Sequence, residues 1–440
     1  MQSYFNELAD QLTAKLTGDE VLLMNLVGEE SDFVRFNESL VRQAGSVQQT
    51  GMGIELIRGS RHASASVALM GLHDEDLTKL LSCLSDLRDR LEVLPEDPHL
   101  LYETEGTSSE DLGENRLTDA GEVVDQILAA GAGHDLVGIY AGGEMFRGFA
   151  NSMGQRNWYR AHSFNLDWSM YLRADKAVKS SYAGYEWDPM AFATKVDGAT
   201  TQLAVMQRDS VKVDPGHYRV YLAPSATADY LGMLGWGGWG LKDHRTKQTA
   251  LLPMLENGAT LHPSMTMIED TAGGIAPNFD GKGFAKPDRV VLIEEGTLKG
   301  CLISPRSAKE FDVPTNGASA SESPESLSVS AGTLPMADVL SALDTGVYIN
   351  NVWYLNWSDR PSCRITGMTR FACFWVENGE IVAPLDVMRF DETLFRAFGS
   401  NLISLTQERE MIFDAGTYDG RSCETSHVPG ALIEGFHFNL

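Results

Sequence analysis

The fold class is indicated most clearly by residues 33–66, which read FVRFNESLVRQAGSVQQTGMGIELIRGSRHASAS. Three pieces are extended in character: the opening FVRF, GIELIRG from Gly53, and ASASVALM, which starts at Ala63 and continues past the stretch. The last alternates small or apolar residues with polar ones, the period-2 pattern of a half-buried strand. Apolar residues at helical spacing predict helices on either side, over residues 3–17 and 74–91. The first unit therefore reads as helix, antiparallel strands and helix.

A change in composition divides the chain after this unit. Residues 95–118 contain two prolines and an acidic run rich in Ser, Thr and Gly, ETEGTSSEDLGEN, which is typical of a solvated connection. A length of 440 residues also predicts two or three domains. We predict an N-terminal α+β domain (1–94), an acidic linker (95–118), a central α+β domain (119–214) and a mainly-β C-terminal domain (215–440). The fold class is multidomain α+β with mainly antiparallel sheets and flanking helices.

Local signals place further elements. VLLMNLV from Val21 predicts another short strand. Helices are predicted to begin near Asp119, after Asp188 and near Ala226, the second with a proline in its first turn. Two hairpin turns are predicted where backbone with positive φ is needed, at Asn378-Gly379 and at Glu295-Gly296.

Composition excludes several classes of function. Thirty-five Lys and Arg stand against 61 Asp and Glu, a net charge of −26, which argues against a surface for nucleic acid or anionic membrane. Five Cys without a Cys-x-x-Cys pair indicate neither a disulfide framework nor a zinc knuckle, so we expect a reducing cytosol. No apolar run approaches the roughly 18–20 residues of a membrane span. The start, MQSYFNELADQL, lacks the features of a signal peptide, and we expect a cytoplasmic location.

Motifs for chemistry are weak. GWGGWG at residues 235–240 matches G-x-G-x-x-G, but it follows a predicted helix, and two Trp crowd a turn that a pyrophosphate would have to approach. The turn either packs its rings on a neighbouring surface or forms an interface loop. We therefore name Trp236, Trp239 and Asp270 as candidates for a peptide or partner surface. Asp270 is included because Glu269-Asp270 ends a strand-like segment, although turn chemistry explains these acids equally well.

Neither a metal site nor a nucleophile is evident from residue patterns. None of the ten His forms H-E-x-x-H or a close helical pair. Cys423 has His427 four residues later, but this spacing in an irregular segment does not place an imidazole on the thiol. Residue chemistry alone thus indicates a multidomain α+β protein without an assigned activity.

An ordered set of segments changes this picture. Residues 33–66 resemble the opening domain of the TldD/PmbA (TldE) family, and FANSMGQRNWYRAHSFNLDWSMYL resembles the family's Asn-Ser-x-Gly stretch. Four further segments follow in the family's order: MTMIEDTAGG, FDGKGFAKPDRVVLIEEGTLKGCLIS, WVENGEIVAP and VPGALIEGFHF. The resemblance covers almost the whole chain. It implies a member of a family of paired cytosolic proteins, also labelled modulators of DNA gyrase.

The resemblance also implies which branch of the family this is. The TldD-like branch is a zinc peptidase with H-E-x-x-x-H, whereas the PmbA/TldE-like branch lacks this motif and partners the first. Aligning VYLAPSATADYLGMLGWGG without gaps puts Gly232, Met233 and Gly237 at the positions of the two His and the Glu. None supplies a nitrogen or carboxylate ligand for Zn²⁺ or a general base. The branch's C-terminal Cys ligand corresponds in neighbourhood to Cys423, whose surroundings depart from the family's Cys-Gly-Lys pattern.

The implied function is therefore that of a non-catalytic subunit with no catalytic or metal residues of its own. Zinc is expected in a TldD-like catalytic partner, and the pair is expected to process or degrade unfolded peptides and leader peptides. Other partners to expect are an extended peptide substrate and, when the chain is alone, a second copy of itself. Two alternatives remain open: a stand-alone hydrolase with a different site, around Cys423 or Glu269-Asp270, and a non-enzymatic binding or regulatory protein.

Overall fold

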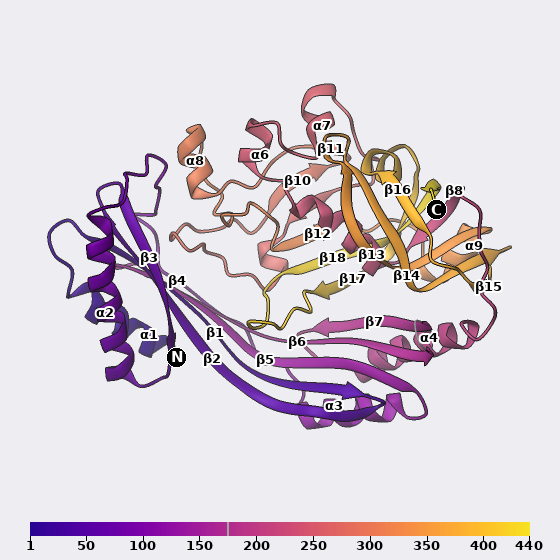
Figure 1. The fold of residues 1–440 in the computed structure, drawn as a ribbon, viewed down its shortest axis with the longest axis horizontal. Coiled ribbons are helices and arrows are strands. Elements are labelled where there is room, and N and C mark those ends of the chain that lie inside the picture. The colour runs from indigo at the N-terminus through magenta and orange to yellow at the C-terminus, as the bar shows by residue number, and fades with distance from the viewer. Residues whose placement is uncertain (174–175) are drawn as a thin grey trace.

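The computed structural model describes residues 1–173 and 176–440. Its backbone forms two sheets, one from each half of the chain. In Figure 1 the long, curved strands of the first sheet run beneath the second sheet, and the two termini lie toward opposite ends of the molecule. The two sheets therefore face each other over part of their length.

The N-terminal sheet contains seven strands in the order β3-β2-β1-β5-β6-β4, with β7 also pairing β6. All its pairings are antiparallel except that of β4 with β6. The strands are β1 (Val21–Asn37), β2 (Leu40–Arg58), β3 (Arg61–Leu69), β4 (Ser109–Leu112), β5 (Asp135–Asn151), β6 (Arg156–Arg173) and β7 (Lys176–Gly184). The predicted short strands VLLMNLV and FVRF prove to be parts of the single strand β1, which corrects that prediction.

Four helices cover this sheet. They are α1 (Gln2–Thr13), α2 (His73–Leu91), α3 (Ala120–Gly131) and α4 (Pro189–Val205), close to the ranges that the sequence predicts. Leucines of α1 and α2 form one core cluster with β1 and β2, and α3 and α4 form a second with β5 and β6. Asp119 and Asp188 cap α3 and α4 by accepting two backbone N–H groups each, which explains where both helices begin.

The N-terminal sheet crosses two of the predicted domain ranges. β1 pairs with β5 from Leu23↔Asn151 to Phe36↔Gly138, so strands from 1–94 and 119–214 belong to one sheet. The predicted linker 95–118 contributes β4, which pairs with β6. The proposed boundaries themselves stay predictions.

The C-terminal sheet is mixed and has eleven strands. Its main path is β11-β10-β9-β12-β18-β16-β14-β13-β8, with β15 on β14 and β17 on β18. The strands are β8 (Gly216–Leu222), β9 (Met267–Glu269), β10 (Val290–Glu294), β11 (Thr297–Leu298), β12 (Ser326–Val329), β13 (Gly346–Asp359), β14 (Arg364–Glu377), β15 (Glu380–Pro384), β16 (Arg389–Thr393), β17 (Leu402–Phe413) and β18 (Thr425–Phe438). Both predicted hairpins are confirmed, because Asn378-Gly379 and Glu295-Gly296 all have positive φ and join paired strands.

Short helices fill the connections of the C-terminal half. They are α5 (Pro224–Gly232), η1 (Met233–Gly235), α6 (Leu241–Arg245), α7 (Leu252–Asn257), η2 (Thr271–Gly273), α8 (Pro305–Phe311), η3 (Met336–Asp338), α9 (Val339–Leu343), η4 (Arg360–Ser362) and η5 (Arg396–Ser400). Tyr230 of α5 is fully buried in the largest core cluster, so α5 is anchored on the C-terminal sheet.

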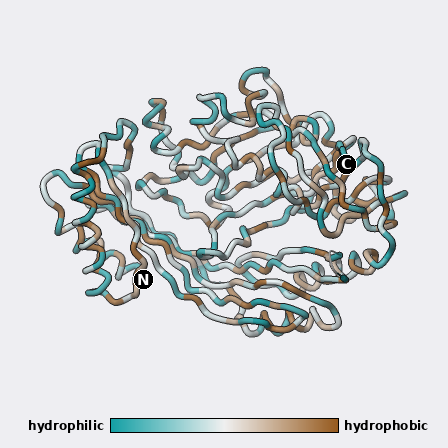
Figure 2. Tube along the Cα trace, in the orientation of Figure 1, coloured by the Kyte–Doolittle hydropathy of each residue, from teal (hydrophilic) through white to brown (hydrophobic). Residues whose placement is uncertain are grey.

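The distribution of hydrophobic residues agrees with this architecture. Hydrophobic stretches follow the strands and the packed helices, and hydrophilic stretches follow many of the outer loops (Figure 2). Among the described residues, none of the helices has the length and apolar character needed to cross a membrane. The prediction of a multidomain α+β fold with flanking helices is confirmed.

Candidate functional site

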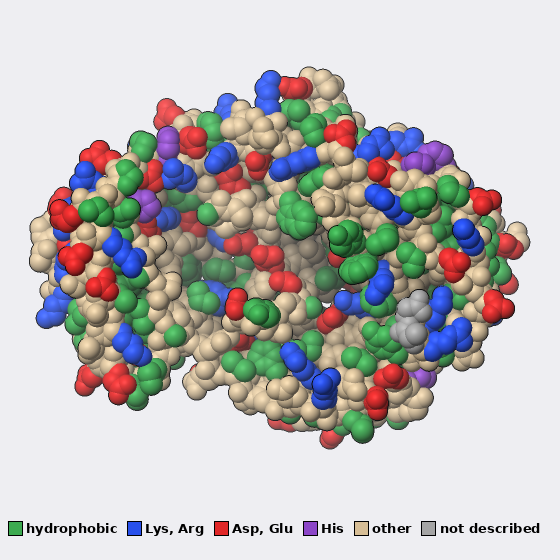
Figure 3. Space-filling view, viewed as in Figure 1, with side chains coloured by type: hydrophobic (Ala, Val, Ile, Leu, Met, Phe, Trp, Pro, Cys, Tyr) green, Lys and Arg blue, Asp and Glu red, His purple; other side chains and the backbone are tan. Residues whose placement is uncertain are grey.

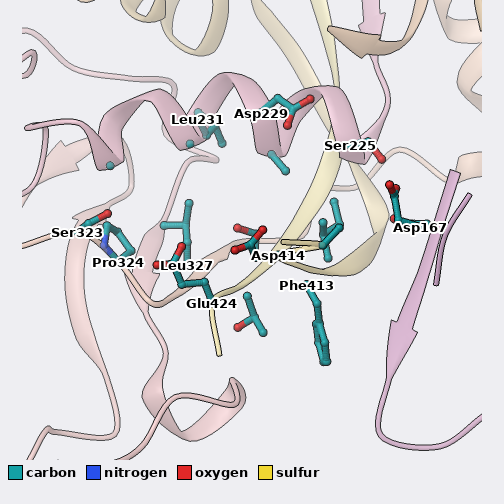
Figure 4. Close-up of a pocket in the computed structure, with 18 of the residues that line it drawn as sticks. Asp167, Ser225, Asp229, Leu231, Ser323, Pro324, Leu327, Phe413, Asp414 and Glu424 are labelled. Atoms are coloured by element: carbon teal, nitrogen blue, oxygen red, sulfur yellow. The ribbon is translucent and has the colours of Figure 1, made fainter. Parts of the chain in front are cut away.

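A cavity of about 430 Å³ lies where the N-terminal sheet meets the C-terminal half. Its walls come from β6, β7, α5, the turn after α5, and the chain on either side of the β17–β18 loop. Figure 3 shows acidic side chains gathered around the hollow in the middle of the molecule. Figure 4 shows Asp229 above the cavity on α5, with Asp414 and Glu424 opposite and Asp167 on a strand at the side. Concave sites of this volume are typical for small ligands or peptide segments.

The charges in this cavity are unbalanced. Its lining contains four carboxylates, those of Asp167, Asp229, Asp414 and Glu424, and one ammonium group, that of Lys179. Lys179 Nζ lies 3.4 Å from Asp167, so the only cation of the lining is already engaged. An unpaired positive charge on a ligand would therefore be attracted into the cavity.

The acidic groups are accessible to water but largely surrounded by protein. Burial raises the pKa of Asp229 to about 6; Lys179 lowers it and Asp167 raises it further. Burial also raises the pKa of Asp167, with Lys179 opposing. The pKa of Glu424 is raised by burial, then by the charges of Asp414 and Glu325. Burial is the largest cause of each shift, so the surroundings disfavour the charged forms of these carboxylates.

The end of α5 borders the cavity. The three residues that align with the family's zinc motif lie at this end of the helix or just after it. Gly232 is the last residue of α5 and lines the cavity, while the Met233 side chain is almost completely buried. Gly237 lies beyond η1 with φ +84°, and a Cβ built on it would collide with the guanidinium of Arg360. No side chain fits at this point without displacing Arg360. The residues present therefore do not fit a zinc site.

The turn after α5 is held by several hydrogen bonds. Arg360 Nη2 donates to the carbonyl of Trp236 at 2.8 Å. His244 Nε2 and Thr249 Oγ1 both bond the Gly238 carbonyl, at 2.8 and 2.9 Å. This accounts for His244 as a structural histidine, and burial lowers its pKa. The turn is therefore a fixed part of the cavity wall.

The two tryptophans of this turn have different environments. The Trp236 side chain is exposed (62%), whereas Trp239 belongs to the main core cluster and is only 1% exposed. Both line the cavity, but only Trp236 offers its ring to a ligand or partner. The Trp239 ring is buried in the core beneath the turn, and a binding role for it stays a prediction. A role of Trp236 in binding stays a prediction.

Asp270 and Glu269 lie outside this cavity and differ from each other. Asp270 forms an exposed ion pair with Arg289 (3.1 Å). Glu269 is buried and accepts backbone N–H groups of Glu325 and Ser326 at 3.1–3.2 Å. The two carboxylates therefore form different contacts, one with a side chain and one with the backbone. Binding of a peptide or partner by Asp270 stays a prediction.

Replacing Glu269 with glutamine is expected to change the pH dependence of stability. Burial raises the pKa of Glu269 to about 7, from 4.5, against the two backbone N–H groups and Lys286. The folded chain therefore holds this proton more tightly, and the stabilisation present below pH 4.5 is lost as pH rises through 7. We expect the unfolding free energy of the wild type to fall by about 2 kcal/mol more than that of Glu269→Gln between pH 5 and 8. Urea unfolding measures this difference. The exposed variant Glu75→Gln should follow the wild type, and parallel profiles for wild type and Glu269→Gln would refute the assignment.

The surroundings of Cys423 do not activate its thiol as a nucleophile. Arg147 Nη2 contacts its Sγ at 3.3 Å, but burial still raises the pKa of the thiol. A thiol with a raised pKa is a poor nucleophile and a poor zinc ligand. Within residues 1–173 and 176–440, no three His, Cys, Asp or Glu side chains are grouped closely enough to hold a metal ion.

A comparison of the sequence with family models decides the identity of the chain. Residues 215–439, just over half of the chain, match the model described as the PmbA/TldA metallopeptidase C-terminal domain. This chain belongs to the PmbA/TldD family. The matched residues contain the C-terminal sheet, α5 and most of the cavity lining, so the family's C-terminal domain supplies most of this site. No curated protein sequence gives a significant match.

Solved structures show the same fold over the full length of this family member. TldE from Thermococcus kodakarensis matches with a TM-score of 0.76 at 14% identity, covering 99% of this chain and 100% of that one. A protein described as a modulator of a DNA gyrase, from Thermotoga maritima MSB8, matches with 0.74 at 14% identity, covering 100% of both chains. A similarly described protein from Bacteroides thetaiotaomicron VPI-5482 matches with 0.73 at 16% identity, covering 99% and 98%. At such identities the likeness shows the fold alone.

The sequence does not reveal most of the cavity. The four carboxylates come from three regions that are far apart in the chain: Asp167 from β6, Asp229 from α5, and Asp414 and Glu424 from the two ends of the β17–β18 loop. None lies in a motif whose residue types alone indicate chemistry. Asp229 does lie three residues before Gly232, inside the segment that aligns with the family's zinc motif. That alignment and the tryptophan-rich turn that follows it were the signals for this region.

Proposed function

We propose that this chain is a PmbA/TldE-like, non-catalytic subunit of a two-chain cytoplasmic metallopeptidase. Its TldD-like partner carries the zinc, and the pair processes or degrades unfolded peptides and leader peptides. The observation that carries the proposal is the wall formed by α5 and its turn. The family's metal-binding segment borders the cavity here, yet Gly232, Met233 and Gly237 provide no zinc ligand, and Arg360 occupies the space at Gly237.

The chain's own contribution would be to bind and orient peptide. β7 pairs with β6 on one side and has no hydrogen-bonded strand on the other within the described residues. Lys179, Ser180 and Ser181 of β7 line the cavity. An extended peptide added along this strand would gain main-chain hydrogen bonds, which accept many sequences. Such tolerance suits a subunit that handles unfolded chains.

Three other functions have less support or need a separate test. A stand-alone cysteine hydrolase needs an activated thiol, whereas burial raises the pKa of Cys423. Direct action on DNA or gyrase-bound DNA conflicts with a net charge of −26. A purely regulatory binding protein would form the same complex without any gain in proteolysis, so activity separates it from the proposal.

The proposal is tested by mixing the purified chain with a zinc-loaded TldD-like protein. We expect the two to co-elute in size-exclusion chromatography, with zinc stoichiometric with the partner and none on this chain. The chain run alone gives its own oligomeric state, including the expected homodimer. Separate elution of the two proteins, or stoichiometric zinc on the lone chain, would refute the proposal.

A further inference from the structure

A groove lined by aromatic side chains opens beside the acidic cavity. Its volume is about 430 Å³, and its aromatic lining is Trp236, Trp353, Tyr354 and Phe371. It shares five lining residues with the cavity: Lys179, Asp229, Gly232, Trp236 and Asn351. The groove and the cavity are therefore two ends of one depression.

The aromatic side chains are held out in the groove by an irregular backbone. Trp353 is 51% exposed and Tyr354 73% exposed. The pairing of β13 with β14 shifts register between Trp353 and Asn356, and both Tyr354 and Phe371 have φ +57°. Positive φ is uncommon for bulky residues and is tolerated where the surroundings enforce it. The bulged strands thus present aromatic rings that a regular ladder would pair differently.

The rings are also fixed in position by contacts with one another and with Arg370. The Arg370 guanidinium lies 4.6 Å from the Trp353 ring centroid and 5.0 Å from that of Phe371. The centroids of Trp353 and Tyr354 are 5.8 Å apart. An ordered, exposed aromatic surface is typical of a binding site, because tryptophan and tyrosine dominate contact energies.

The carboxylates next to the groove favour a ligand that carries a positive charge. Asp229 is common to groove and cavity, and Asp167, Asp414 and Glu424 lie beyond it. A ligand that fits both ends must combine an apolar side chain with a nearby positive charge. The volume of about 430 Å³ suits a short peptide segment, whereas a stable subunit interface buries roughly 1,200–2,000 Å² of surface.

We propose that the groove and the cavity bind one extended peptide segment, with an apolar side chain against Trp236, Trp353 and Tyr354 and a neighbouring lysine, arginine or N-terminal ammonium among the carboxylates. This inference rests on the proposed peptide-handling role and narrows its substrate class to hydrophobic, basic segments. Trp236 stands where the two ends meet, and its carbonyl is held by Arg360.

The test uses the full chain alone and fluorescence anisotropy. The probe is an end-labelled, unstructured peptide of phenylalanine and lysine, compared with peptides carrying glutamate for lysine or serine for phenylalanine. The lysine peptide should bind about tenfold more tightly than the glutamate peptide, and added salt should reduce this difference. The serine peptide should also bind about tenfold more weakly than the first.

Matched variants assign the binding to the two ends. Trp353→Ala should weaken binding of the phenylalanine–lysine peptide about tenfold, whereas Met190→Ala, at a hydrophobic residue on α4 that is even more exposed (79% against 51%), should not. Asp229→Asn with Asp414→Asn should remove most of the preference for lysine over glutamate, whereas Asp74→Asn on α2 should leave it intact. Circular dichroism melting checks that each variant is folded.

Three outcomes would overturn the inference: equal binding of the lysine and glutamate peptides, unchanged peptide binding by Trp353→Ala, or loss of co-elution with the TldD-like partner in Trp353→Ala while peptide binding persists. The last would make the groove a subunit interface. Peptide selectivity without any effect of the chain on a partner would instead leave this inference standing and remove the proposed function.

Discussion

Replacing Arg421 with alanine is expected to lower the free energy of unfolding by about 4 kcal/mol, because it removes the buried charge that joins the two halves of the molecule. Arg421 lies in the β17–β18 loop and is only 8% exposed. Its Nη2 donates to the Oγ and carbonyl of Ser163 at 2.6 and 2.8 Å, and its Nη1 donates to the Gly143 carbonyl at 3.2 Å. All of these acceptors belong to the N-terminal sheet.

The carboxylate of Glu29, whose charge acts on the Arg421 guanidinium, is also buried. Glu29 of β1 accepts from Gln49 at 2.6 Å and from the Arg421 backbone N–H at 3.3 Å. Burial lowers the pKa of Arg421, and the Glu29 carboxylate opposes that shift. Alanine at 421 would leave Glu29 without its counter-charge and the Ser163 and Gly143 acceptors without donors, which is costlier than losing an exposed pair.

Urea unfolding with matched variants measures this effect. Arg42→Ala, at an exposed arginine of β2, should change the unfolding free energy by less than about 0.5 kcal/mol. The double variant Glu29→Gln with Arg421→Met should lose less than Arg421→Ala alone, since no buried charge stays uncompensated. If Arg421→Ala and Arg42→Ala were equally stable, the loop would not join the halves as described.

Introducing the family's second histidine at Gly237 is expected to destabilise the chain by about 3 kcal/mol. The backbone there has φ +84°, and any Cβ would displace Arg360 from its hydrogen bond with the Trp236 carbonyl. Gly232→His is the control, because a Cβ at Gly232 meets no atom within 4 Å. Gly232→His should lower the free energy of unfolding far less than Gly237→His.

Thermal and urea unfolding of the two histidine variants test this difference. The triple variant Gly232→His, Met233→Glu and Gly237→His should also fail to bind zinc stoichiometrically, because a side chain at 237 strains the backbone at φ +84° and must displace the Arg360 guanidinium. Equal stability of Gly237→His and Gly232→His, or stoichiometric zinc on the triple variant, would show that the turn still accommodates the motif.

Local chemistry made part of the fold predictable. The hairpins at Asn378-Gly379 and Glu295-Gly296 follow from the turn residues, and α4 follows from Asp188 and Pro189 at its start. Such signals depend on near neighbours in sequence. The turns and the helix start that they predict therefore do not depend on tertiary contacts with distant residues.

The continuity of β1 was not predictable in the same way. Residues 28–32, GEESD, read as a polar break between two short strands. In the structure Gly28 lets the Phe146 ring approach closely, and Glu29 is buried because Arg421, almost 400 positions later in the chain, packs beside it. A buried polar residue such as Glu29 has the sequence pattern of a loop residue, because the partner that explains its burial is far away in the chain.

The cavity was hidden for the same reason. Its carboxylates are brought together by the packing of α5 and the β17–β18 loop onto the N-terminal sheet, and Trp353 and Tyr354 reach the groove through a bulge that no local pattern announces. Two signals pointed to this region: the tryptophans of the GWGGWG turn, and the positions of Gly232, Met233 and Gly237. The second came from the resemblance to the family rather than from residue chemistry.

The most direct test of the account is the rate of peptide cleavage by a fixed amount of zinc-loaded TldD-like partner as this chain is added. We predict that the rate rises and levels off when the two chains are equimolar, and that this chain alone cleaves nothing. A rate that stays flat across the titration, or cleavage by this chain without the partner, would contradict the view that it shapes a peptide site whose metal lies elsewhere.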